Sequence, residues 1–263
     1  MIISTRQRPT KDEVEEAQYL AKAWDAVYLE RDKKSFRKWL NETRQCIYVV
    51  HDKADKLYHP SCEEPFYFHP SMSFLRIKRM MKGEPDPLIE TIRGKAGMKV
   101  FDATLGFGSD SIVLSYVAGE EGQVIGMEKN HYISRIVQKG LPQWEEDLPA
   151  FNQAMRRVKV LTGESYKFLR EQADQSFDYV YFDPMFEHTS DRSPHFRAIR
   201  PHAHYGRLHE NDVKEALRVA KKCVVVKSSY PNQNIEKLGF SFHNRRSRSS
   251  FRYGIIEKKG RIT

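Results

Sequence analysis

The stretch Val100-Phe-Asp-Ala-Thr-Leu-Gly-Phe-Gly-Ser-Asp110 decides the fold of this chain. It begins as a short β-rich run, turns at Gly106 and Gly108, and leads into a helical segment. Glycine lets the backbone turn sharply and approach a ligand closely. The first N–H groups of the following helix would face a carboxylate or a phosphate. The stretch therefore predicts a strand, a loop and a helix that hold an anionic group, although a G-x-G turn is also found without any ligand.

From Met98 onward, short β-rich runs alternate with helical segments, a pattern that is typical of βαβ units and a parallel sheet. Two final runs are joined by a short Arg- and Ser-rich turn and predict an antiparallel hairpin at one edge of that sheet. The predicted fold class is therefore α/β, with a Rossmann-like sheet of five parallel strands and a C-terminal hairpin. The runs lie at Lys99–Ala103, Gln123–Met127, Val158–Leu161, Phe177–Phe182, Cys223–Lys227, Phe240–Arg245 and Phe251–Glu257.

The residues before this region predict a small α/β unit of their own. Thr10-Lys-Asp-Glu13 has the T-x-x-E form of a capping box, and an apolar helical stripe follows it from Val14 to Tyr28. The Pro-containing stretch from Tyr58 to Pro70 is the expected boundary, so we predict domains at 1–65 and 66–263. The other predicted elements are a strand at Ile2–Thr5, helices at Ser35–Thr43, Ser71–Lys82 and Pro87–Arg93, and a strand at Cys46–His51.

Composition narrows the class of protein. The net charge of +9 and the pI near 9.3 favour a polyanionic partner, because basic side chains set against phosphates release counterions, although a soluble enzyme can simply be basic. Cys46, Cys62 and Cys223 are odd in number and far apart, which argues against a disulfide framework and a Cys-based zinc site. No apolar run approaches the ~18 residues of a membrane span. We expect a cytoplasmic protein without a membrane partner.

Four carboxylates stand at the ends of successive predicted strands: Asp102, Glu128, Glu164 and Asp183. Glu128 lies 26 residues after Asp102, where a carboxylate can accept both hydroxyls of a ribose. Glu164, in Gly163-Glu164-Ser165, could accept a hydrogen bond from an adenine amino group. An isolated acid is more often a surface group or a helix cap. Together the four mark the edge at which open α/β sheets bind ligands.

The tetrad Asp183-Pro184-Met185-Phe186 resembles the (D/N)-P-P-(F/Y/W) motif of methyltransferases that act on exocyclic amino groups of nucleobases. Such an amine is a poor nucleophile, because its lone pair is delocalised into the ring. The Asp183 carboxylate and a backbone carbonyl held by Pro184 could accept its two N–H bonds, and a base could stack on Phe186 for about 1–3 kcal/mol. The electrophile is already cationic, so we predict no metal. Asp183, Pro184 and Phe186 are the candidate catalytic residues.

Residues 187–209 are rich in histidine and arginine, and the Arg-rich turn at 245–252 adds more positive charge. A metal site is conceivable from the five histidines, but no carboxylate–histidine spacing typical of zinc enzymes occurs. A basic loop beside the predicted methyl acceptor is more naturally a segment that grips substrate. Both segments could follow a phosphate backbone, so RNA is the predicted partner.

Four stretches together resemble the methyltransferase J family, the guanine-N2 methyltransferases of small-subunit ribosomal RNA. They are Val100–Asp110, Gly126-Met-Glu-Lys129, Val180-Tyr-Phe-Asp-Pro-Met-Phe186 and Val224-Val-Val-Lys227, and the resemblance runs from about Met98 to Glu257. It implies the class I fold and S-adenosylmethionine as the cofactor. The loop supplies Asp102, Thr104, Gly106 and Gly108 as candidate cofactor-binding residues, and the resemblance adds Ser109, Asp110, Glu128, Lys129, Glu164, Ser165 and Asp183.

The chain departs from that pattern in three places. Thr104 stands where many class I enzymes have a third glycine, and the loop after D-P-M-F is rich in His and Arg rather than Lys. The first ~65 residues show no such resemblance. A ribosomal RNA base N-methyltransferase is the favoured interpretation, and a small-molecule or protein methyltransferase is the alternative. A nucleotide-binding oxidoreductase is disfavoured by Ser111 at the third glycine of G-x-G-x-x-G, and a non-catalytic RNA-binding protein by the intact D-P-M-F.

Overall fold

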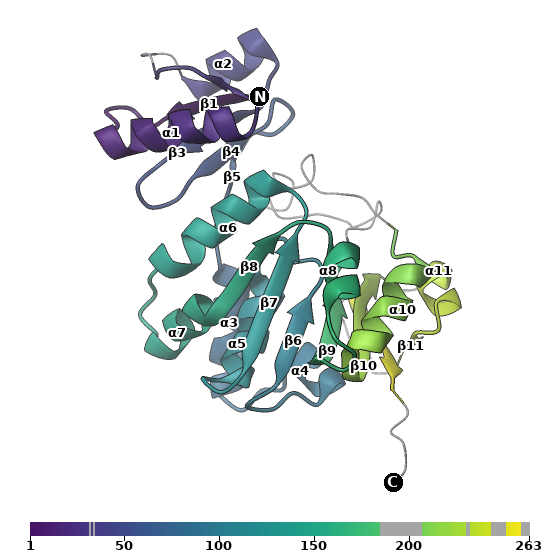
Figure 1. Cartoon of the computed structure of the whole chain (residues 1–263). Helices are drawn as coiled ribbons and strands as arrows, with labels where there is room; N and C mark the ends of the chain where they lie inside the picture. The colour runs from purple at the N-terminus through teal and green to yellow at the C-terminus, as the bar shows by residue number, and fades with distance from the viewer. Residues whose placement is uncertain (32, 34, 185–206, 230–231, 243–250, 259–263) are drawn as a thin grey trace. The chain divides into compact units, whose positions relative to one another are not determined.

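The computed structural model describes residues 1–31, 33, 35–184, 207–229, 232–242 and 251–258 (Figure 1). Its described residues form two compact units. The first contains residues 1–69 and 135–144, and the second contains the rest. The predicted domain limit between residues 65 and 66 stays a prediction. None of the helices in the described part of the chain is long and apolar enough to cross a membrane.

The first unit is built on a five-stranded sheet in the order β2-β1-β3-β4-β5. Strand β1 is parallel to β2 and β3, whereas β4 is antiparallel to both of its neighbours, β3 and β5. The predicted capping box is present, since Thr10 and Glu13 cap each other at the start of α1. The elements are β1 (Ile2–Thr5), α1 (Lys11–Ala23), β2 (Val27–Tyr28), α2 (Phe36–Thr43), β3 (Ile47–Val50), β4 (Lys56–Tyr58) and β5 (Phe66–Tyr67).

The apolar stripe from Val14 to Tyr28 is helical only in part. Helix α1 ends at Ala23, because Asp25 takes a left-handed backbone conformation with φ 49°, and Tyr28 belongs to β2 instead. The strands β2, β4 and β5 are two or three residues long, too short to show an alternating pattern. Residues 135–144 join this unit through Lys139, which donates to the buried Asp55 at 2.8 Å.

The second unit contains a seven-stranded sheet in the order β11-β12-β10-β9-β6-β7-β8 (Figure 1). The five predicted parallel strands are present, and β12 is antiparallel to both β10 and β11. The predicted hairpin strands pair as expected where they are described, with β12 inserted between β10 and β11. The strands are β6 (Lys99–Asp102), β7 (Gln123–Glu128), β8 (Val158–Thr162), β9 (Phe177–Phe182), β10 (Ala220–Ser229), β11 (Ser241–Phe242) and β12 (Phe251–Glu257).

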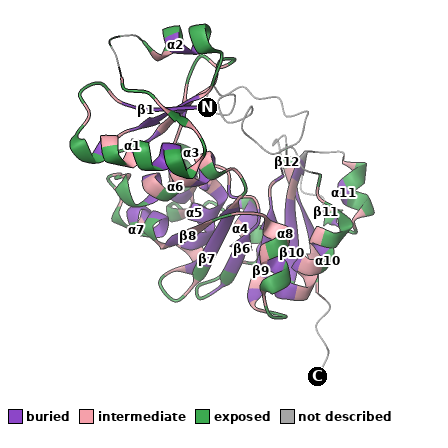
Figure 2. Ribbon diagram, turned by 45° about the horizontal axis from the view of Figure 1, so that its top comes forward, coloured by how far each residue is buried: buried purple, intermediate pink, exposed green. Residues whose placement is uncertain are grey.

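Both faces of this sheet are buried, as expected for parallel strands. One apolar cluster joins strand residues such as Phe101 to α8, α10 and α11, and the other joins residues such as Val100 to α4 and α5. Figure 2 shows the strands as largely buried and the helices as partly exposed. The helices are α3 (Ser71–Met81), α4 (Pro87–Ile92), α5 (Ser109–Ala118), α6 (His131–Gln143), α7 (Pro149–Arg157), α8 (Ser165–Glu171), α10 (Glu210–Val219) and α11 (Gln233–Lys237).

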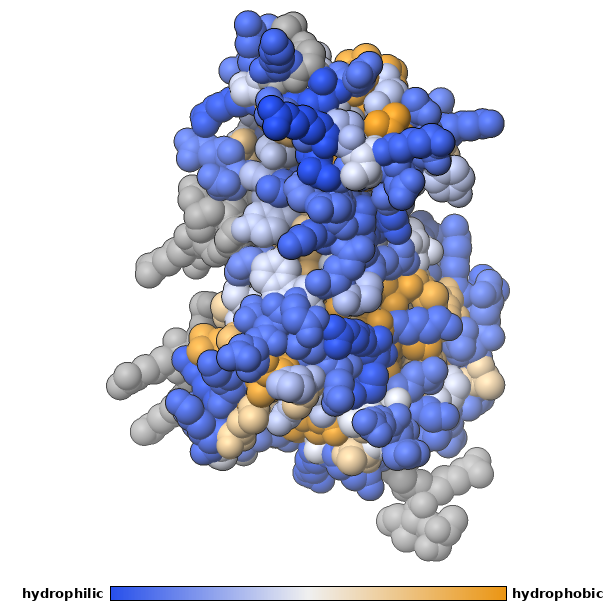
Figure 3. Space-filling model, turned by 90° about the vertical axis from the view of Figure 1, so that its left-hand side faces the viewer, coloured by the Kyte–Doolittle hydropathy of each residue, from blue (hydrophilic) through white to orange (hydrophobic). Residues whose placement is uncertain are grey.

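The surface is mainly polar, in line with the mean hydropathy of −0.67. Figure 3 shows one face on which hydrophilic residues predominate and apolar residues form separate small patches. Single exposed apolar side chains are ordinary on soluble proteins, so these patches need no functional explanation. The chemistry of the chain is instead concentrated at the carboxyl ends of the parallel strands.

Candidate active site

The glycine loop connects β6 to α5 at the centre of the sheet. Gly106 and Gly108 have φ values of 52° and 75°, a region that other residues rarely adopt, so the predicted sharp turn is present. Gly108 is the N-cap of α5, and the Gly106 N–H donates to Glu128 Oε2 at 3.1 Å. Ser109 is the first helical residue, so the N–H groups of the first turn of α5 face the loop.

Asp102 organises this loop from inside. Its side chain is buried, and Oδ1 accepts the Thr104 N–H at 3.0 Å while Oδ2 accepts the Ser111 hydroxyl at 2.6 Å. Thr104 in turn accepts the Asp183 backbone N–H with Oγ1. Thr104 therefore links the glycine loop to Asp183, the first residue of D-P-M-F. A direct contact of Asp102 or Thr104 with a cofactor stays a prediction.

The buried carboxyl of Asp102 should make stability depend on pH. Burial raises the pKa of Asp102 to about 7, although its hydrogen bonds with Ser111 and Thr104 oppose this rise. An unfolded Asp has a pKa of about 3.9, so the folded state binds more protons between these values and loses stability as pH rises toward 7. Asp102→Asn cannot ionise. We expect its melting temperature, relative to wild type, to be about 5 °C higher at pH 8 than at pH 5.5.

Thermal unfolding of both proteins at the two pH values measures this difference. Asp147→Asn is the control, because Asp147 is exposed in the loop before α7. Equal differences between variant and wild type at pH 5.5 and pH 8 would show that Asp102 does not change its ionisation state within this range.

Glu128 ends β7 beside the glycine loop. Its Oε1 accepts the Asn130 N–H at 2.8 Å, and its Oε2 accepts the Gly106 N–H. Burial raises the pKa of Glu128, while these backbone N–H groups lower it. A carboxylate oxygen has two lone pairs, so each oxygen can still accept a ribose hydroxyl. The geometry therefore fits the role predicted for Glu128.

The next strand end brings Glu164 to the same edge. Its neighbour Gly163 donates its N–H to the Glu128 carbonyl at 2.9 Å, which joins the ends of β7 and β8. Glu164 is half-exposed and forms ion pairs with Lys167 at 2.8 Å and Lys129 at 3.2 Å, which lower its pKa. Ser165 donates its hydroxyl to the Ala103 carbonyl. Four predicted positions, Glu128, Lys129, Glu164 and Ser165, thus lie together at the edge of the sheet.

Asp110 faces a different set of partners. Its Oδ1 pairs with Arg76, and its Oδ2 accepts from the Tyr181 hydroxyl at 2.9 Å and from Lys227 at 3.2 Å. Burial would raise the pKa of Asp110, but Lys227 and Arg76 hold it well below its usual value. Asp110 is only 8% exposed, so its charge is neutralised within the protein. Its predicted contact with the cofactor stays a prediction.

Asp183 follows β9 and is more accessible than Asp110. Its side chain is 34% exposed, compared with 9% for that of Asp110, and its Oδ2 lies 2.8 Å from Lys227 Nζ. Burial and the nearby Asp110 raise the pKa of Asp183, and Lys227 opposes them. Pro184 is buried next to it. The candidate residue Phe186, the basic loop up to Gly206 and the turn arginines 245, 246 and 248 lie outside the described residues.

Two site residues were missed by sequence reasoning. Lys227 was part of the quoted Val224–Lys227 stretch without a role, although a lysine that ends a buried strand at this edge is a usable signal. Arg76 stands among other basic residues of Ser71–Lys82, and nothing in the sequence sets it apart. Its side chain is 19% exposed and donates two hydrogen bonds to Asp86, at 2.8 and 2.9 Å, as well as one to Asp110.

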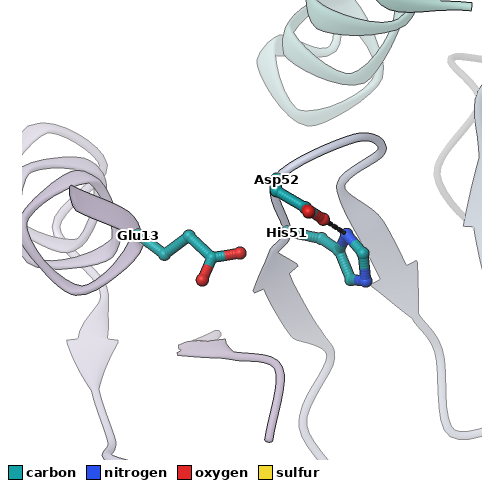
Figure 4. A group of neighbouring side chains, drawn as sticks. All are labelled: Glu13, His51 and Asp52. Atoms are coloured by element: carbon teal, nitrogen blue, oxygen red, sulfur yellow. Dashed lines mark ion pairs between the residues drawn. The ribbon is translucent and has the colours of Figure 1, made fainter. Parts of the chain in front are cut away.

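One group of possible metal ligands occurs among the described residues. Glu13, His51 and Asp52 place ligand atoms within 4.8 Å of one another in the first unit (Figure 4). The charge of Glu13 is already balanced by Arg6, whose Nε donates to Oε1 at 2.7 Å, and Oε2 accepts the Thr10 N–H at 2.6 Å. His51 pairs with Asp52. We therefore assign Glu13 to the cap of α1, not to a metal. His209 of the basic loop is the N-cap of α10.

The strand order with its inserted antiparallel strand, the glycine loop and the strand-end carboxylates together define a class I methyltransferase that uses S-adenosylmethionine. The chain belongs to the family described as putative SAM-dependent methyltransferases, whose model matches residues 67–255. The solved SAM-dependent methyltransferase NGO1261 of Neisseria gonorrhoeae has a TM-score of 0.61 and 16% identity, and the likeness covers 99% of this chain and 97% of that one. At this identity it shows the fold alone.

Relatives by sequence fall into two groups. The uncharacterized protein YpiP of Bacillus subtilis (strain 168) is 35% identical over 97% of this chain and 99% of its own length. Ribosomal RNA small subunit methyltransferase J of Pseudomonas aeruginosa (strain LESB58) is 31% identical over 61% of this chain and 60% of its own length. The same-named protein of Psychrobacter arcticus is 25% identical over 58% of this chain and 53% of its length. The match thus spans little more than half of the length of these RNA methyltransferases.

The residues present fit the cofactor. Glu128 is an ionisable acceptor for the ribose, and the first turn of α5 offers N–H groups to the carboxylate of the methionine part. Glu164 and Ser165 lie at the next strand end, on the side expected for adenine. The cofactor supplies an electrophilic methyl group on a sulfonium. Which of these residues touch it stays a prediction.

Proposed function

We propose that this methyltransferase transfers a methyl group to an exocyclic amino group of an RNA base, and that the base is a guanine of small-subunit ribosomal RNA, modified at N2 in the cytoplasm. The observation that carries the proposal is the half-exposed Asp183, which ends the strand next to the glycine loop and has one oxygen bound to Lys227. Its other oxygen can accept a hydrogen bond from a substrate, at the edge of the sheet where we expect the cofactor.

In this proposal Asp183 Oδ1 accepts one N–H of the amine, and the Pro184 carbonyl accepts the other. Accepting both N–H bonds localises the nitrogen lone pair toward the methyl group. The N–C bond then forms as the S–C bond breaks, and the methylated amine releases a proton to water. Positioning and electrostatics provide most of the catalysis in this scheme.

The distribution of charge supports an RNA substrate. Residues 1–69 contain twelve Lys or Arg and twelve Asp or Glu, so the whole net charge of +9 lies in residues 70–263. A positive field around the methyltransferase domain attracts a polyanion. The name of the relatives in Pseudomonas and Psychrobacter supports ribosomal RNA in particular, and D-P-M-F supports guanine N2 through the resemblance described above.

A methyl-transfer assay tests this proposal. Small-subunit RNA from cells that lack the protein is incubated with the enzyme and labelled cofactor, then digested to nucleosides. We expect label in N2-methylguanosine, and labelling about a thousandfold slower with the Asp183→Ala variant. Label in another methylated nucleoside would correct the target base. Label only in protein or a small molecule would favour the alternative substrate classes.

A further inference from the structure

A chain of alternating charges runs through the second unit and ends at Asp183. Asp86 holds Arg76 through two hydrogen bonds, Arg76 pairs with Asp110, and Asp110 shares Lys227 with Asp183. These side chains come from the start of α4, from α3, α5 and β10, and from the end of β9. The methyl-transfer scheme above uses only the last of them. The ammonium of Lys227 is the link between Asp183 and the rest.

We infer that Lys227 is a positioning residue for methyl transfer, which keeps Asp183 anionic and turns its Oδ2 away from the substrate so that Oδ1 faces the amine. This inference rests on the proposed function. It assigns Lys227 no contact with the reacting atoms. Lys227 acts through Asp183.

The contacts around Lys227 restrict where its charge can lie. Its Nζ is 2.8 Å from Asp183 Oδ2 and 3.2 Å from Asp110 Oδ2, and it lies 4.9 Å from the centre of the Phe251 ring. A cation over an aromatic face is attracted to it. Lys227 is also paired in register with Tyr253 of the neighbouring strand β12. Because the Lys227 ammonium is also held by Asp110 and Phe251, it can keep the Asp183 carboxylate in one orientation.

The charges facing this pair explain why Asp183 needs the lysine. Asp110 on α5 is a second anion, Arg76 on α3 is already bound to Asp86, and Asp102 lies near the same edge. Tyr181 and Tyr253 are buried and neutral neighbours, whose pKa values are raised by burial and by Asp110. Without Lys227, Asp183 would be a partly buried acid beside another anion, which favours its protonated form. A protonated Asp183 is a weaker acceptor for the amine.

The variant Lys227→Met tests the inference. We expect kcat for RNA methylation to fall about tenfold, with the Kd for S-adenosylhomocysteine nearly unchanged. Activity requires ionised Asp183, so it is lost as pH falls through the pKa of that group. Losing the cation raises this pKa, and the acid limb of the kcat profile should move up by about one pH unit. Lys227→Arg should restore most of the pH profile.

The matched control is Lys222→Met on the same strand. Lys222 Nζ lies 3.5 Å from Asp178 Oδ1, at the opposite end of the β9–β10 pair. The Lys222→Met variant should therefore leave the pH profile of kcat unchanged. A double variant guards against simple misfolding, since Asp183→Asn with Lys227→Met removes one charge of each sign. If Lys227 acts through Asp183, Lys227→Met should have little further effect on kcat in the Asp183→Asn background.

Two outcomes would overturn the inference: an acid limb that stays in place in Lys227→Met, or a full additional loss of kcat in the Asp183→Asn background. If wild type transfers no methyl group to RNA, the proposed function fails instead. The titration of Asp183, followed by carboxyl ¹³C NMR in wild type and in Lys227→Met, then still tests the electrostatic link. Identical titration midpoints in the two proteins would overturn that link.

Discussion

Asp183→Ala is expected to lower kcat for methyl transfer about a thousandfold, the size of effect seen when a group that stabilises charge in a transition state is removed. The amine gains its nucleophilic lone pair only if an acceptor holds its N–H bond, and alanine offers none. The backbone N–H of residue 183 can still donate to Thr104, so the glycine loop should keep its shape. The Kd for S-adenosylhomocysteine should therefore change by no more than about fivefold. Single-turnover methylation and calorimetry measure the two quantities.

Asp178→Asn is the matched control, because Asp178 lies near the other end of the same strand, where it accepts the Lys99 N–H at 2.8 Å and pairs with Lys222. It should have wild-type kcat. Asp183→Asn should fall between alanine and wild type, since an amide oxygen still accepts one N–H but carries no charge. Wild-type kcat in Asp183→Ala would remove Asp183 from the reaction and leave the chain with a different acceptor.

The main sheet could be predicted from the sequence because its strands are buried on both faces. The apolar runs Val100-Phe101 and Val224–Val226 then stop at a polar residue, Asp102 or Lys227, which marks the edge of the sheet. The short strands of the first unit carry no such pattern. Val27 is exposed and Tyr28 only partly buried, and their pairing with Ile2 and Ile3 is what makes them a strand.

Residues of the candidate site could be predicted from the sequence only where they stand at the end of a predicted strand. Glu128 and Asp183 were found because each stands at the end of a predicted strand. The partners of Asp110 could not be found in this way, since Arg76 lies 34 residues before it and Lys227 lies 117 residues after it. Both are basic residues in a basic chain, and whether such a residue is solvated or buried in an ion pair depends on the tertiary fold. Their burial is what separates them from the surface arginines and lysines.

Glu128→Ala should raise the Kd for S-adenosylhomocysteine about a hundredfold, since hydrogen bonds to a charged group contribute about 1.5–3 kcal/mol each. The loss has two sources. The ribose hydroxyls lose their acceptor, and the N–H groups of Gly106 and Asn130 lose the carboxylate that holds the loop against β7. Glu128→Gln keeps one acceptor oxygen and should cost about tenfold. Glu121→Ala, exposed just before the same strand, is the control and should bind as wild type.

Glu128→Ala should change the Kd of the cofactor without changing kcat, whereas Asp183→Ala should do the reverse. Glu128 lies at the end of β7 and Asp183 at the end of β9, on either side of β6 in the sheet. If the cofactor lies across these ends with its ribose at Glu128, then Glu128→Ala at saturating cofactor should keep kcat within about threefold of wild type while its Kd rises, because binding lost equally from ground and transition states does not change kcat. A Kd within twofold of wild type would show that the ribose is held elsewhere. A large fall in kcat at saturation would place Glu128 close to the reacting atoms and contradict a ribose bound at the end of β7.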